Sequence, residues 1–158
     1  MAESPLHHRM KAIMRAELER GGYRVLEEPL FPPSRRVFWS SYRPDLLGYR
    51  KEMGEEELVI VECETHPNVR RFASKNYSSL WFQPFLFEGG SIRRLLAVPQ
   101  GGLHGVNLGL RKEWEVWVLG RKGPLCKIGL LGEPEVVPSA KGDPCIPASD
   151  APGSDMRA

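Results

Sequence analysis

With 158 residues, of which 41% are hydrophobic and 27% charged, the chain is long enough for one domain with a substantial core and too short for two. Its formal net charge of +2 is too small to indicate nucleic-acid binding by itself. Its three cysteines form no CxxC or Cys/His zinc pattern, which indicates a reducing compartment, and no apolar run resembles a signal peptide or a membrane span. We therefore expect a cytoplasmic protein that does not associate with membranes.

The first predicted element is an amphipathic helix over residues 5–20. Ser4 suits the N-cap and Pro5 the first helical position, while Gly21 and Gly22 are expected to end the helix. Its apolar stripe is made of Leu6, Met10, Ile13, Met14 and Leu18.

The rest of the chain predicts a mixed α/β domain. Apolar patterning predicts strands at 23–26, 36–41, 45–49, 58–64, 92–98 and 113–120. The charged segment 51–57 is predicted to be a hairpin loop, and 67–82 a second helix. Residues 1–138 should form a single domain with a small mixed central β-sheet flanked by helices. Residues 139–158, rich in Pro, Gly and Ser, are expected to be a disordered tail.

Three carboxylates lie on two strands that the sequence predicts to be neighbours. Asp45 begins one strand, and Glu62 and Glu64 end the strand at 58–64. Side chains alternate between the faces of a strand, so Glu62 and Glu64 should share one face while Cys63 points to the other. Two acids so placed in an apolar strand repel each other and lose hydration, which is costly unless a cation neutralises them. A divalent metal with oxygen ligands, and hence metal-assisted hydrolysis, is therefore expected.

The order of these motifs resembles the PD-(D/E)XK nuclease superfamily. A helix ending in Gly-Tyr-x-Val is followed by x-Arg-Pro-Asp, by apolar-apolar-Val-Glu-x-Glu and by a second predicted helix, so the resemblance covers about residues 5–100. It implies a restriction endonuclease-like core in α-β-β-β-α-β order and a Mg²⁺ or Mn²⁺ site. Carried over by position, Asp45 and Glu62 become metal ligands, and Glu64 and the carbonyl of Cys63 are further candidates. The metal would activate water for attack on a phosphodiester.

The sequence departs from this family at Glu64, which stands where a lysine is usual. A glutamate there can bind metal or orient water, but it does not supply a positive charge to the transition state. Lys75 is the nearest candidate for a displaced lysine, with a solvated surface position as the alternative.

Glu17 is a further candidate catalytic residue, because it falls inside the apolar stripe of the first helix and a first-helix glutamate near the metal is common in the superfamily. The alternative is that it pairs with an arginine. Basic residues expected to contact nucleic acid are Arg43, Lys75, Arg70 and Arg71.

Three functions fit the sequence. The leading hypothesis is a metal-dependent nuclease acting on DNA, with a homodimer as its possible form because nucleases that cut both strands are often two-fold dimers. The second is a catalytically inactive protein of the same fold that binds nucleic acid or a partner protein. The third is a protein-interaction domain whose acids merely pair with neighbouring arginines.

Overall fold

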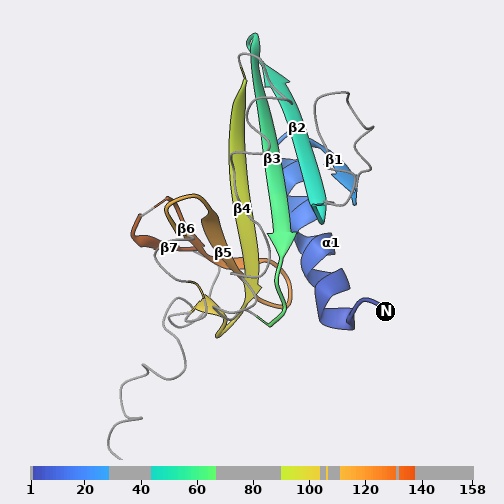
Figure 1. Ribbon diagram of the computed structural model, residues 1–158, viewed down its shortest axis with the longest axis vertical. Coiled ribbons are helices and arrows are strands. Elements are labelled where there is room, and N and C mark those ends of the chain that lie inside the picture. The colour runs from blue at the N-terminus through green and yellow to red at the C-terminus, as the bar shows by residue number, and fades with distance from the viewer. Residues whose placement is uncertain are drawn as a thin grey trace, which may run out of the picture.

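In a computed structural model of the chain, the structure describes residues 2–28, 44–66, 90–103, 106, 111–130 and 132–137. These residues form one mixed seven-stranded sheet with helix α1 packed on one face, as Figure 1 shows. The α/β class predicted from the sequence is therefore correct, although the sheet is larger than the small one expected.

Helix α1 (Pro5–Arg20) begins and ends where the sequence predicts. The hydroxyl oxygen of Ser4 accepts a hydrogen bond from the amide of His7 at 3.1 Å, which satisfies one of the free N–H groups of the first turn. At the other end the chain reverses through Gly21 and Gly22, and the φ of Gly22 is +86°. A glycine accepts this left-handed conformation without steric cost, so the helix ends sharply and leads directly into the first strand.

The seven strands lie side by side in the order in which they occur along the chain. They are β1 (Arg24–Glu27), β2 (Leu46–Glu52), β3 (Glu55–Cys63), β4 (Ser91–Pro99), β5 (Glu115–Leu119), β6 (Pro124–Ile128) and β7 (Pro134–Val136). Strand β4 runs parallel to both β3 and β5, and every other neighbouring pair is antiparallel. Parallel neighbours require crossover connections, and the one between β3 and β4 passes through residues 67–89, outside the described ranges.

Each face of the sheet carries its own apolar cluster. On the face covered by α1, Met10 and Met14 of the helix pack with Val59, Val61 and Cys63 of β3. The opposite face has a second cluster, whose members include Leu58, Ile60, Leu96, Val116, Val118, Cys126 and Ile128. The continuous apolar run of β3 is therefore explained by burial on both faces, as expected for a central strand.

The hairpin between β2 and β3 corrects the sequence-based boundaries. Segment 51–57 is not a loop, because β2 continues to Glu52 and β3 begins at Glu55. Opposite charges face each other across the two strands, with an Arg50–Glu57 pair at 2.7 Å and a Lys51–Glu56 pair at 3.4 Å. Charged residues that resemble a loop in sequence thus stabilise the hairpin as cross-strand pairs.

The remaining predictions concern the other strands, the second helix, the tail and the cysteines. The predicted strands at 23–26, 45–49, 58–64, 92–98 and 113–120 correspond to β1 to β5, whereas β6 and β7 were not predicted. The predicted strand 36–41, helix 67–82 and tail 139–158 lie outside the described residues, as does the domain boundary at 138. The expectation of a reducing compartment does not fit Cys126, which is disulfide-bonded, whereas Cys63 is a free thiol.

The two-residue turn between β2 and β3 generates a stability prediction. Met53 and Gly54 have φ values of +51° and +84°, as a tight hairpin turn requires. Replacing Gly54 with Ala should lower the free energy of unfolding by about 1 kcal/mol, because a side chain at this φ is strained. Gly123→Ala is the matched control, since its added Cβ also meets no atom within 4 Å and its φ is not positive. Urea denaturation should show a loss for the first variant only, and equal losses would contradict the argument.

Candidate metal centre

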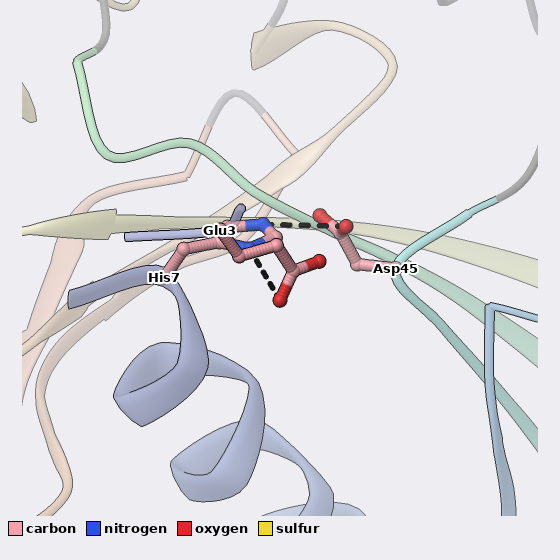
Figure 2. Close-up of side chains that lie close together, drawn as sticks. All are labelled: Glu3, His7 and Asp45. Carbon is pink, nitrogen blue, oxygen red and sulfur yellow. Dashed lines mark ion pairs between the residues drawn. The ribbon is translucent and has the colours of Figure 1, made fainter. Parts of the chain in front are cut away.

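Three potential metal ligands converge beside the N-terminal end of α1. Glu3 precedes the helix, His7 lies in its first turn, and Asp45 immediately precedes β2. The imidazole of His7 lies between the two carboxylates, with Nδ1 3.4 Å from Oε2 of Glu3 and Nε2 3.3 Å from Oδ1 of Asp45, as Figure 2 shows. One potential ligand atom from each residue lies within 4.8 Å of the others. The three side chains are 25%, 17% and 15% exposed, so the cluster is shielded but accessible from solvent.

Asp45 is held in place by the backbone of both neighbouring strands. Its Oδ2 accepts a hydrogen bond of 2.7 Å from the amide of Cys63, at the end of β3. Its own carbonyl accepts one of 3.0 Å from the amide of Glu28, just after β1. A carboxylate bonded in this way has a fixed orientation, with Oδ1 directed towards His7.

Lys11, on the buried face of α1, compensates the negative charge of Glu3. Its ammonium group, on a side chain only 4% exposed, lies 3.0 Å from Oε1 of Glu3 and 2.9 Å from Oε1 of Glu27. Burial alone would raise the pKa of Glu3, but the hydrogen bond from Lys11 and the charge of His7 outweigh it and lower that pKa. Burial likewise opposes the charge of Lys11, yet its bonds to Glu27 and Glu3 raise its pKa above the ordinary value. Both groups are therefore ionised at neutral pH.

Glu62 and Glu64 are buried at the end of β3, with 5% and 1% exposure. As predicted, strand alternation places them on the face opposite Cys63, which packs against α1. Their potential ligand atoms do not join the Glu3–His7–Asp45 group among the residues that the structure describes. The structure therefore brings Asp45 together with Glu3 and His7 rather than into a closed trio with Glu62 and Glu64.

The pKa of the Cys63 thiol reflects the negative charge at this end of the sheet. Burial raises its pKa well above the ordinary value, and the negative charges of Asp45 and Glu62 raise it further. The thiol is therefore neutral at physiological pH and unsuited to bind metal as a thiolate. Both carboxylates therefore act on this thiol electrostatically. The predicted role of the Cys63 carbonyl as a metal ligand stays a prediction.

Glu17 lies far from these acids. It is ten residues beyond His7 in the same helix, which corresponds to about 15 Å along the axis. Its carboxylate pairs with Arg20, as the alternative to a catalytic role predicted. Glu17 also lines a cavity at the C-terminal end of α1. The expectation that Glu17 would lie beside Asp45 is not met, and Glu3 is the glutamate that α1 brings to this position.

The sequence contains a signal for this end of the helix. Only Gly21, Gly22 and Tyr23 connect α1 to β1, so α1 must run antiparallel to β1. Because β1 to β3 alternate in direction, the start of α1 then lies at the start of β2 and the end of β3. Figure 1 shows the N-terminal end of α1 and the arrowhead of β3 at the same end of the sheet. This reasoning selects Glu3 and His7 over Glu17.

The residues predicted to contact nucleic acid, Arg43, Arg70, Arg71 and Lys75, lie outside the described ranges, so their role stays a prediction.

The described residues thus define an α/β protein with a carboxylate–imidazole cluster at one end of a mixed sheet. Comparison of the chain with known protein families, with curated proteins and with solved structures finds no match. In the described ranges, no helix has the length and apolar character needed to cross a bilayer.

Lys11 generates the first prediction of this site. Replacing it with Met should lower the free energy of unfolding by about 2 kcal/mol, because Glu3 would keep its partly buried position without its main counter-charge. Arg15→Met is the control, since Arg15 is 46% exposed and its ion pairs should contribute less than about 0.5 kcal/mol. Thermal and urea unfolding of both variants measure the difference, and similar losses in the two would refute the special role of Lys11.

The lowered pKa of Glu3 predicts how stability depends on pH. A carboxylate with a depressed pKa in the folded state stabilises the protein above its unfolded pKa, near 4.5, and loses that contribution as the pH falls through the folded value. The stability difference between wild type and Glu3→Gln should therefore be largest near neutral pH and shrink below about pH 4.5. Urea denaturation across this range is the measurement. A difference independent of pH would show that Glu3 contributes through packing instead of charge.

Proposed function

We propose that this protein is a metal-dependent nuclease of the PD-(D/E)XK type that hydrolyses phosphodiester bonds in DNA. The observation that carries the proposal is the gathering of carboxylates from three elements at one end of the sheet: Glu3 before α1, Asp45 before β2, and Glu62 and Glu64 at the end of β3. Such a concentration of negative charge in a partly buried site favours a divalent cation.

The donor set fits Mg²⁺ or Mn²⁺. Carboxylate oxygens are the ligands that both ions prefer, and the imidazole of His7 adds a nitrogen that Mn²⁺ accepts more readily than Mg²⁺. Each of its ring nitrogens faces one carboxylate, and a single ion can bind only one of them. Metal binding therefore requires His7 to give up one of its two present contacts.

The protein's own residues would hold the site and position a substrate. The Cys63 amide fixes Asp45, and Lys11 fixes Glu3, so both carboxylates are oriented before any ion binds. A bound divalent ion would activate a water molecule and shield the charge of the scissile phosphate. Glu62 and Glu64, buried at the same end of the sheet, are the further carboxylates that would bind the ion or orient that water.

The complex with DNA is a proposal that rests on residues outside the described ranges. Arg43, Arg70, Arg71 and Lys75 are the expected phosphate contacts, and a homodimer is the expected form if both strands are cut. A cytoplasmic location is part of the same proposal, and the disulfide at Cys126 is the observation that counts against it.

A specific observation favours the alternative of a catalytically inactive protein with the same fold, which binds nucleic acid or a partner protein. Both oxygens of Asp45 already have partners, the Cys63 amide and His7. The charge of Glu3 is likewise compensated by Lys11. The cluster is thus stable without a metal, and Glu64 replaces the lysine expected of an active enzyme.

Metal binding and DNA cleavage separate these functions. Wild-type protein is tested with Mg²⁺ and Mn²⁺ for a metal-induced rise in melting temperature and for cutting of plasmid, single-stranded and branched DNA. A metal at 100 times its dissociation constant should stabilise the fold by about 2.7 kcal/mol. Asp45→Asn and Glu62→Gln should each reduce cleavage by about 100-fold. Asp45→Asn keeps an oxygen for the Cys63 amide, so its effect is not one of misfolding.

Glu19→Gln is the matched control, because Glu19 lies on the exposed side of α1 with its side chain 53% exposed. DNA binding without cutting would support the inactive alternative. The absence of both binding and metal-induced stabilisation in the wild type would refute the nuclease and the nucleic-acid-binding alternative together.

A further inference from the structure

A second polar site lies at the opposite end of α1 from the metal centre. A cavity of about 600 Å³ opens between the last turn of the helix and strands β4 to β7. This volume lies within the range of small-ligand sites. Its walls include Trp117 of β5, Lys127 of β6, Glu135 of β7 and Glu133 just before β7. None of these four residues belongs to the Glu3–His7–Asp45 cluster.

Both aromatic rings of the cavity carry a cation. The ammonium group of Lys127 lies 4.2 Å from the centre of a Trp117 ring, and the guanidinium of Arg50 lies 4.5 Å from that of Tyr23. A positive charge over the face of an aromatic ring is attracted by the ring's quadrupole. Trp117 of β5 and Lys127 of β6 are cross-strand neighbours, so the pairing of the two strands holds the ammonium group and the ring together. The cavity is therefore chemically suited to cations.

The arginines of the cavity are already neutralised by acids. Arg93 makes two hydrogen bonds to the carboxylate of Glu115, at 2.7 and 2.9 Å. The remaining pairs are Arg20 with Glu17 and Arg50 with Glu57. An anionic ligand would have to break these pairs, so the cavity is poorly suited to phosphate.

The carboxylates of Glu133 and Glu135 differ from these acids in having no arginine or lysine partner within the described part of the chain. Neither makes an ion pair with any of the residues that the structure describes, and both side chains belong to exposed residues. Glu135 is the cross-strand neighbour of Lys127, yet the ammonium group of Lys127 lies on Trp117. The C-terminal end of α1, which carries the negative end of the helix dipole, lines the same cavity. Glu133, Glu135 and the end of the helix therefore give the cavity negative charge that no described cation pairs with.

We propose that this cavity binds an aliphatic ammonium or guanidinium cation, carried either by a free polyamine or by a lysine or arginine side chain of a partner protein. The incoming cation takes the place of Lys127 on Trp117 and pairs with Glu133, while Lys127 turns to its cross-strand neighbour Glu135. Two carboxylates are then matched by two cations. This site is independent of the proposed nuclease activity, because it shares no residue with the metal centre.

Isothermal titration calorimetry at low salt tests the proposal. Spermidine represents the free polyamine and a short lysine- and arginine-containing peptide represents the partner, with a glutamate-containing peptide as the anionic comparison. The double variant Glu133→Gln/Glu135→Gln should weaken binding of either cation by about 10-fold or more. Glu19→Gln, which removes an exposed carboxylate of α1 that does not line the cavity, should bind like the wild type. Circular dichroism verifies that each variant is folded.

Trp117→Phe provides an independent readout. Binding of the cation should change the tryptophan fluorescence of the wild type, and this change should be lost in Trp117→Phe. Because Trp117 is also part of the core, the surface double variant keeps the test decisive if the Phe variant does not fold. Stronger binding of spermidine supports a polyamine site, and stronger binding of the peptide supports a protein partner. Absence of binding by both cations, or equal affinity in wild type and double variant, overturns the proposal.

Discussion

The direction of helix α1 on the sheet is the constraint on which both polar sites depend. The short connection from Gly21 to Tyr23 forces α1 to run antiparallel to β1, and the packing of Met10 and Met14 fixes the helix against the central strands. Its first turn is thereby held at the end of β3, and its last turn beside β4 to β7. A helix running the other way would exchange the two ends and leave Asp45 without Glu3 and His7.

The helix dipole gives the two ends different chemical character. At the N-terminal end, which carries partial positive charge, the structure gathers the carboxylates of Glu3 and Asp45. At the C-terminal end, which carries partial negative charge, cations occupy the faces of Tyr23 and Trp117. One helix thus separates a carboxylate-rich centre, proposed to bind a divalent metal, from an aromatic cavity proposed to bind an organic cation. At both ends, the partial charge of the helix dipole attracts groups of the opposite charge.

Buried Lys11 connects the metal centre to the fold itself. Its ammonium group bridges Glu3 and Glu27, so it ties the segment before α1 to the end of β1. Such an arrangement stabilises the carboxylate of Glu3 in its charged form, which metal binding would also require. It also lets the cluster persist without an ion, which is why an inactive, binding-only protein remains the chief alternative to a nuclease.

Local patterns in the sequence determined the capped helix from Pro5 to Arg20 and the continuous apolar run of β3, because residues close together in the chain set both. The sequence also predicted that Asp45 and the end of β3 lie on neighbouring strands, which the pairing of β2 with β3 confirms. They could not reveal β7, whose three residues are exposed and form a strand only by pairing with β6. Nor could a helical pattern by itself show that Glu3 and His7, rather than Glu17, lie beside Asp45. A pattern defines which face of a helix is buried, and the short connection to β1 sets the direction of α1. The order and directions of β1 to β3, which bring the start of α1 to the end of β3, are seen only in the tertiary structure.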